Sequence, residues 1–276
     1  MSSVALAYED YVEGAAITDV SISGDMYGEL EALQDMRLSK GVGFGAGTNG
    51  IFCYWNWGEK RPVDYVSLLS FVHPEEESGN LSLVLFGDDV TEYHIVFDAF
   101  QTPIYRYPHA GFAQHLHFFL DAPFQARRLL TSMSFSGPMS IGRVWAGPLW
   151  RPPVGTRTEW QPPVVDPGEM RRSRGNQGYP RRRQRHRRLV GEINRVPKPW
   201  AIGEPESSVM DIQQMGFRLG KTEPCVLFPY TQLGDDSLDV HSIHRLGCYG
   251  HFNQPLRPRH VGADRYKADV DFGELL

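Results

Sequence analysis

Three short stretches of the sequence contain residue types that take part in ligand chemistry. The first, GAGTNG, places Gly45, Gly47 and Gly50 at the spacing of a glycine-rich dinucleotide loop. Such a loop needs a following helix whose N-terminus binds the pyrophosphate. The stretch that follows here, IFCYWNWG, is rich in aromatic residues and is typical of a strand. The spacing therefore indicates a flexible loop, and we predict no nucleotide cofactor.

The second stretch, HLH, is of a type that binds metals. His115 and His117 share one face of a strand, and only Asp121 stands near them at ligand spacing. An exposed sheet face explains the pair better, just as a hairpin turn explains the sequence GDD at residues 87–89 better than a calcium loop. We therefore predict no metal site. No GxSxG, HExxH or phosphate-loop motif occurs, so we predict no catalytic residues and no enzyme.

The third stretch is aromatic and leaves two alternatives open. Tyr54, Trp55 and Trp57 are residue types that stack on sugar rings, and an aromatic core strand explains them equally well. If the stretch binds a sugar, these three residues are the glycan-contact candidates.

A basic run follows the middle of the chain, with nine arginines between Arg171 and Arg188. Three interpretations compete: a nucleic-acid surface, a mobile loop, and a strand or hairpin that faces a partner subunit. Nucleic-acid modules usually interleave aromatic and basic residues, and only Tyr179 does so here. We therefore favour an oligomer interface and expect no nucleic-acid partner. The interface candidates are Arg181, Arg183, Arg185 and Arg187.

The charge changes sign along the chain. Residues 1–149 carry 8 basic and 18 acidic side chains (net −10), residues 150–200 carry 13 and 4 (net +9), and residues 201–276 carry 7 and 11 (net −4), in agreement with −5 for the whole chain. The change coincides with the proline-rich exit of MSIGRVWAGPLWRPP. We expect a first domain at 1–149, a Pro/Arg-rich connector and basic strand at 150–205, and the rest of a second domain at 206–276.

Short apolar or alternating stretches separated by turn residues predict strands at 15–24, 65–72, 79–89, 91–100, 115–123, 140–148, 223–230, 242–252 and 265–275. Residues 27–36 favour one or two helical turns. The clearest helix lies within 206–221, with Ser207 or Ser208 as its cap and Gly220 at its end. The sequence therefore predicts a mainly all-β protein. An N-terminal β-sandwich or jelly roll precedes a smaller C-terminal β-domain with one short α-helix.

Cysteine usage and hydropathy indicate in which compartment the protein is made and whether it crosses a membrane. Cys53, Cys225 and Cys248 are an odd count without regular spacing, which predicts neither a disulfide framework nor a zinc site. A pair between Cys225 and Cys248 across strands is the less favoured alternative. No run of 18 apolar residues and no signal-like start occurs. We therefore expect synthesis in a reducing cytoplasm and no membrane span.

The stretch HLHFFLDAPFQARRLLTSMSFSGPMSIGRVWAGPLWRPP resembles the last strands of galactose-binding-like (discoidin-type) jelly rolls, which contain the form I-x-I-G-R-hydrophobic-aromatic-x-G. Together with the arginine segment, the short helix and the later stretches EPCVLFPY and GCYGHF, it is similar to distal tail proteins of long-tailed (siphovirus-like) bacteriophages. In those proteins the ring-forming domain commonly comes first, whereas here the jelly roll does.

The resemblance implies a virion protein of the tail tip, made in the host cytoplasm. It implies a ring of copies of the chain, often a hexamer, with the tail tube, hub and tape-measure proteins as partners. The +9 segment of one copy would then meet the −10 domain of the next. We therefore predict a structural component that joins the tail tube to the baseplate. The alternative is a glycan-binding module for attachment to the host surface.

Overall fold

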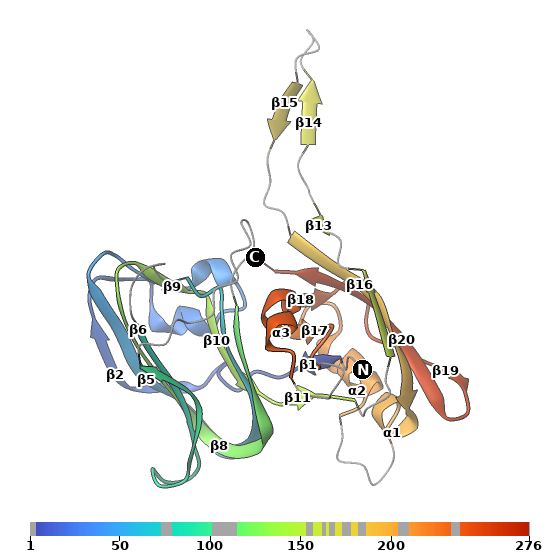
Figure 1. Cartoon of the computed structure of the whole chain (residues 1–276), viewed down its shortest axis with the longest axis horizontal. Coiled ribbons are helices and arrows are strands. Elements are labelled where there is room, and N and C mark those ends of the chain that lie inside the picture. Colours follow the sequence, from blue (N-terminus) through green and yellow to red (C-terminus); the bar gives the residue numbers. More distant parts are fainter. Residues whose placement is uncertain are drawn as a thin grey trace.

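The computed structural model describes residues 4–275, except 73–78, 101–114, 153–156, 162–163, 166–168, 173–177, 182–185, 204–209 and 233–237. Two β-domains lie side by side (Figure 1). The first strand, β1 (Ala5–Ala7), pairs with strands of the second domain, and the chain returns there at β11 (Leu149–Trp150). The jelly roll is therefore inserted between two strands of the other domain. The expected domain boundary at residue 150 misses this crossover.

The first domain is a sandwich of two antiparallel sheets. The larger has the order β10-β5-β8-β6-β7, with β2 also paired to β5, and the smaller has the order β3-β4-β9. The larger sheet contains β2 (Ala16–Ser23), β5 (Thr48–Leu69), β6 (Gly79–Phe86), β7 (Tyr93–Phe100), β8 (Leu116–Ser136) and β10 (Arg143–Gly147). The smaller contains β3 (Met26–Tyr27), β4 (Val42–Phe44) and β9 (Met139–Ile141), with the 3-10 turns η1 (Leu30–Gln34) and η2 (Leu38–Lys40) beside it.

Strict alternation explains which side of the larger sheet faces the core. Leu81, Leu83 and Leu85 of β6 are buried, whereas the residues between them are half-buried on the outer face. The side-chain period of a strand is two, so one register places every leucine of this run inside. The alternation predicted in this stretch is therefore confirmed.

The second domain is built on one antiparallel sheet of order β11-β1-β17-β18-β20-β16-β12, with β13 also paired to β16 and β19 to β20. Its later elements are β12 (Arg157–Gln161), β13 (Val164–Val165), β16 (His186–Pro197), α1 (Lys198–Ala201), α2 (Ile212–Leu219), β17 (Cys225–Phe228), α3 (Val240–Leu246), β18 (Cys248–Phe252), β19 (Pro258–Gly262) and β20 (Arg265–Glu274). Strands thus occupy part of the expected connector at 150–205. The mainly β fold class predicted from the sequence is confirmed.

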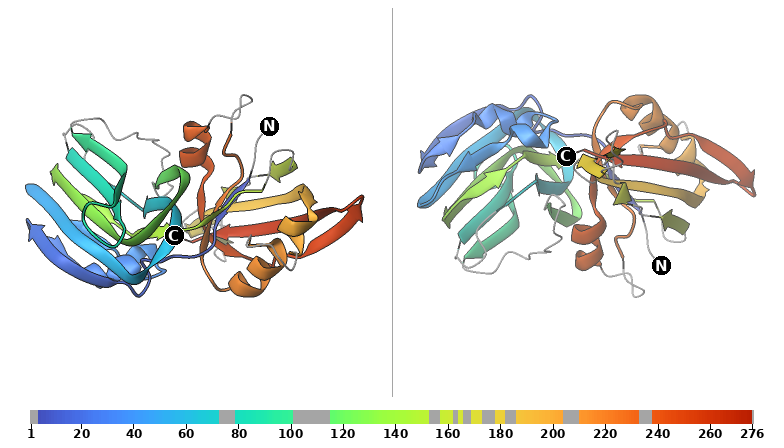
Figure 2. Two further views of the ribbon diagram at one scale, coloured as in Figure 1. Left: turned by 90° about the horizontal axis from the view of Figure 1, so that it is seen from below. Right: turned by 90° about the horizontal axis from the view of Figure 1, so that it is seen from above.

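The central strand β17 is buried on both faces. Cys225 and Leu227 pack in the cluster that contains α2, whereas Val226 and Phe228 pack in a second cluster shared with the jelly roll. α2 therefore covers one face of the sheet, and α3 and the jelly roll cover the other, as the two views of Figure 2 show. Burial on both sides explains why the four residues of β17, CVLF, are all apolar.

Two predicted elements differ from the structure. Residues 242–252 do not form one strand: α3 occupies Val240–Leu246, and Asp239 caps it by accepting from the Ser242 N–H at 3.0 Å. α2 begins at Ile212, because Asp211 caps it by accepting from the Gln214 N–H at 2.9 Å; the expected caps Ser207 and Ser208 lie outside the described residues. Gly220 ends α2 with φ of 54°, as predicted.

A two-stranded hairpin projects from the second domain (Figure 1). It consists of β14 (Glu169–Arg172) and β15 (Gly178–Arg181), whose backbones pair with each other in register from Glu169–Arg181 to Arg172–Gly178. Among the described strands, neither pairs with any other sheet. We call this segment the arm.

Candidate functional site

A row of four aromatic side chains, two exposed and two half-buried, lies on the solvent side of the larger jelly-roll sheet. Ring centroids are 5.7 Å apart between Phe52 and Tyr54, 5.8 Å between Tyr54 and Phe86, and 6.2 Å between Phe86 and Tyr93. A solvated sheet face usually alternates to polar residues, so a contiguous apolar row marks an interaction surface. We call it the aromatic face. Its members are Phe52, Tyr54, Phe86 and Tyr93.

Strand pairing positions these rings. Phe52 and Tyr54 are two residues apart on β5, so they share the outer face, whereas Trp55 points into the core. Phe86 of β6 lies opposite Tyr93 of β7. The side chain of Phe52 is 37% exposed and that of Tyr93 is 55% exposed.

A cation lies over the middle of the aromatic face. The guanidinium of Arg128, from β8, is 5.1 Å from the Tyr54 ring centroid and 5.2 Å from that of Phe86. Among the described residues its Nε has no hydrogen-bond partner. This Nε is buried, so the surface offers a ligand aromatic rings and a positive charge.

The structure separates the three glycan-contact candidates. Trp55 is fully buried and its indole N–H donates to the Thr131 hydroxyl at 3.0 Å, so no ring face is open to a ligand. Trp57 is half-buried, packs against the core, and donates to the Ala126 carbonyl at 2.9 Å. Only Tyr54 belongs to the aromatic face. The sequence alternative of a core strand therefore applies to Trp55.

The interface candidates of the arginine run also divide. Arg183 and Arg185 lie outside the described residues, and Arg181 lies in the arm strand β15. Arg187 bonds within its own chain. Its guanidinium pairs with Glu274 at 2.5 Å and donates to the carbonyls of Arg245 and Gly247, each at 3.0 Å. These bonds hold the end of α3, and the interface role of Arg187 stays a prediction.

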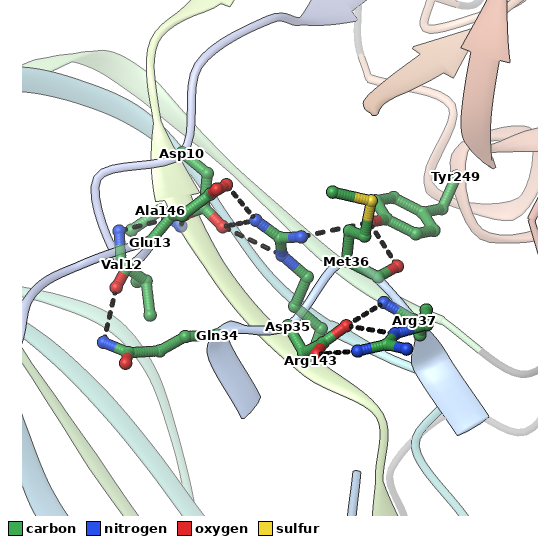
Figure 3. Close-up of polar contacts among 10 residues, drawn as sticks. All are labelled: Asp10, Val12, Glu13, Gln34, Asp35, Met36, Arg37, Arg143, Ala146 and Tyr249. Carbon is green, nitrogen blue, oxygen red and sulfur yellow. Dashed lines mark hydrogen bonds and ion pairs between the residues drawn. The ribbon is translucent and has the colours of Figure 1, made fainter. Parts of the chain in front are cut away.

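A buried charge network fixes the jelly roll to the second domain (Figure 3). Arg143 of β10 donates to the Asp10 carboxylate at 2.7 and 3.0 Å and to Glu13 at 2.8 Å. It also donates to the hydroxyl of Tyr249, from β18, at 3.1 Å. The Tyr249 hydroxyl in turn donates to the Met36 carbonyl at 2.8 Å. One side chain thus joins the N-terminal segment and both domains.

The side chains of Arg143 and Asp10 are 0% and 2% exposed. Burial lowers the pKa of Arg143, but Asp10, Tyr249 and Glu13 together raise it more, so the net direction is upward and the guanidinium stays charged. The Asp10 carboxylate accepts two further bonds, from the Val12 and Ala146 N–H groups. A buried ion pair needs such additional hydrogen bonds to offset its desolvation. The network therefore fixes the domain arrangement.

Sequence reasoning missed Arg143 as a structural centre. The available signal was a single arginine inside the apolar stretch SIGRVWAG. In the structure, all five residues of β10 in this stretch are buried. A strand that is apolar on both faces is covered on both, so a charge within it requires a buried partner.

The expected binding motifs of the first half have structural roles. The loop with Gly45 and Gly47 leads into β5, not into a helix. His115 and His117 are buried, which corrects the expected exposed face. Among the described residues, no three His, Cys, Asp or Glu side chains gather as metal ligands.

The cysteines and the helices concern two remaining expectations, the Cys225–Cys248 pair and the membrane span. All three cysteines are free and buried, and in β17 and β18 Cys225 lies opposite Gly250, not Cys248. Within the described ranges, no helix has the length and apolarity needed to cross a membrane.

No protein-family model and no curated protein matches the chain. Chitosan-binding module 1 of a chitosanase/glucanase from Paenibacillus sp. IK-5 is similar, with 13% identity and a TM-score of 0.35 over 51% of this chain and 99% of the module. The lectin domain of lectinolysin, complexed with Lewis B antigen, has 17% identity and a TM-score of 0.34 over 51% and 96%. The family 32 carbohydrate-binding module of C. perfringens NanJ, in complex with galactose, has 12% identity and a TM-score of 0.33 over 53% of this chain and 99% of the module.

These neighbours are discoidin-type jelly-roll modules, and each spans about half of this chain. At such identities and TM-scores they carry no argument about what the chain binds.

Proposed function

We propose that the chain is a non-catalytic carbohydrate-binding protein whose binding surface is the aromatic face of the jelly roll. The observation that carries the proposal is the continuous row of four aromatic rings on one sheet face, with exposed rings at its two ends and half-buried rings between them. Aromatic side chains offer a large apolar surface at low conformational cost, and the apolar C–H face of a sugar ring packs on such a surface. The guanidinium of Arg128 adds a positive charge beside the Tyr54 and Phe86 rings.

The test is binding of the whole chain to a glycan array, followed by titration with the best glycan. Replacing the exposed ring of Tyr93 by alanine removes stacking area without opening the core, so we expect binding to weaken about tenfold, which corresponds to about 1.4 kcal/mol. Phe217→Ala is the matched control, since Phe217 is 83% exposed on α2 of the other domain. The proposal is contradicted if the chain binds no glycan on the array. It is also contradicted if Phe217→Ala weakens glycan binding as much as Tyr93→Ala does.

A second candidate is the assembly role that the resemblance to distal tail proteins implies, and the arm favours it. An isolated two-stranded hairpin is at best marginally stable in water, and the arm pairs with no other sheet among the described strands. Docking on a neighbouring copy would supply the missing burial. The arginine run, which overlaps the arm, is positively charged, whereas residues 1–149 carry a net charge of −10, so the two are electrostatically complementary.

Light scattering during size-exclusion chromatography tests this candidate. We expect the full chain to form an oligomer that weakens as salt is raised, because salt screens exposed charges. A chain in which a short Gly-Ser turn replaces residues 167–184 should be monomeric. A full-length chain that stays monomeric at every concentration and salt level contradicts the assembly role and leaves the glycan proposal untouched.

A further inference from the structure

Three histidines meet where α3 of the second domain packs on β8 of the jelly roll. The ring centroids of His115 and His117 are 5.7 Å apart, and those of His117 and His244 are 5.8 Å apart. The rings of Tyr65 and Phe228 enclose His117 from β5 and β17. The contact thus joins two domains through groups that titrate in mildly acidic solution.

Hydrogen bonding requires His244 to be neutral. Its Nδ1 lies 2.9 Å from the Val240 carbonyl, which only accepts, so Nδ1 carries the proton. Its Nε2 accepts from the backbone N–H of His117 at 3.3 Å and therefore needs a free lone pair. A second proton on Nε2 would face that N–H and break the bond. The bond between the two domains thus exists only in the uncharged form.

His115 is neutral for a similar reason, because its Nδ1 accepts from the Ser70 N–H at 3.0 Å. The Nδ1 of His117 bonds the Tyr65 hydroxyl at 2.7 Å, and that hydroxyl can donate or accept. The Nε2 atoms of both are buried without a hydrogen-bond partner among the described residues. A charge on either ring would therefore lie in an apolar enclosure.

The surrounding charges also oppose protonation. From β16, Arg187 is close enough to lower the pKa of both His115 and His117, and its counter-ion is Glu274 of β20. The thiol of Cys248 on β18 is neutral because burial raises its pKa to about 12. On the β5 side, burial raises the pKa of the Tyr65 hydroxyl, and the nearby Asp10 is paired with Arg143.

Burial lowers the pKa of all three histidines, that of His115 to about 3. The pKa of such a histidine is lower in the closed state than in the open state. The closed state therefore keeps its full stability only when the pH is above the open-state pKa. That stability is lost progressively as the pH falls below about 6.5, the ordinary histidine pKa. His244 is only partly buried, so it is the first of the three that water reaches.

We propose that the His117–His244 contact is an acid-sensitive latch, which opens α3 away from β8 when His244 takes up a proton. The bond from Arg143 to Tyr249 and the part of the shared apolar cluster outside α3 keep the two domains together while the latch opens. Opening uncovers the aromatic surface of Phe228 and His117. The latch is independent of the aromatic face and of the arm.

Amide hydrogen exchange of the intact chain tests the latch, with the His117 amide as the main reporter. Opening that takes up one proton lowers the protection factor about tenfold for each pH unit below about 6.5. In His244→Gln, the glutamine oxygen can still accept from His117 but does not titrate. We expect its slope of log protection against pH to be about one proton smaller than in the wild type.

His260→Gln is the matched control, because His260 is exposed on β19 beside Tyr266, and it should keep the wild-type slope. Wild-type protection that is independent of pH overturns the latch, as does a wild-type slope in His244→Gln. A measurement without any variant covers the case in which His244→Gln does not fold. Imidazole ¹⁵N shifts should show His244 as the neutral Nδ1–H tautomer at pH 7.5, and the Nε2–H tautomer contradicts the latch.

Discussion

Replacing Arg143 by methionine should destabilise the protein strongly. The side chain is fully buried, and its loss leaves the Asp10 carboxylate, 2% exposed, without a counter-ion. The Tyr249 hydroxyl loses its donor in the same step. Breaking a buried ion pair by removing one partner costs about 3–5 kcal/mol, because an uncompensated buried charge remains. We therefore expect the free energy of unfolding to fall by about 3–5 kcal/mol.

Urea unfolding followed by both tryptophan fluorescence and far-UV circular dichroism measures this change, and coincident curves establish that both domains unfold together. Arg37→Met is the matched control. It removes an arginine from an exposed ion pair with Asp35 in the same region (Figure 3), and its stability should be indistinguishable from the wild type.

A double-mutant cycle isolates the charge effect. Asp10→Asn keeps an acceptor for the backbone N–H groups that Asp10 binds but removes the charge that Arg143→Met would strand. The double variant should therefore be more stable than the sum of the two single losses implies. An Arg143→Met variant within about 1 kcal/mol of the wild type, the range of surface ion pairs, would refute the reasoning.

Four further outcomes are expected. Trp55→Ala should cost about 3–5 kcal/mol in chemical denaturation because it opens the core, whereas Tyr54→Ala on the aromatic face should cost about 1 kcal/mol or less. Gly216→Ala should cost about 1–3 kcal/mol in the same assay despite alanine's better helix propensity, since its Cβ would lie 2.2 Å from a backbone oxygen. Burial raises the pKa of Asp64 to about 6, so its ionisation opposes folding as the pH rises through 6; Asp64→Asn should raise the melting temperature at pH 7.5, with the gain vanishing towards pH 4. A thiol reagent at pH 8 should label the native chain negligibly and the unfolded chain fully, because these thiols are buried: Cys53, Cys225 and Cys248.

The sequence predicted elements best where a local pattern decides the structure. Residues 79–86 and 265–274 alternate, and they form β6 and β20. Residues 242–252 alternate too, yet the first half is α3. Ile243 and Leu246 are three residues apart, which suits a helix as well as a strand, and the Asp239 cap selects the helix.

The candidate sites show the same limit. Alternation places Tyr54 and Trp55 on opposite faces of β5, but the pattern does not say which face another sheet covers. The smaller sheet and its turns cover the face of Trp55. An interpretation that treats Tyr54, Trp55 and Trp57 alike is therefore wrong for at least one of them, since Tyr54 lies on the outer face and Trp55 in the core.

By itself, the sequence determined a mainly β protein, the alternation of its strands and a change of charge near residue 150, because composition and the order of neighbouring residues specify these features. Tertiary structure decided that β1 completes the second domain, that Arg143 is a buried junction and that His117 meets His244. Asp10 and Arg143 are 133 residues apart, and Arg143 and Tyr249 are 106 apart. Which of two amphipathic faces becomes buried depends on such distant partners, and no local pattern specifies them.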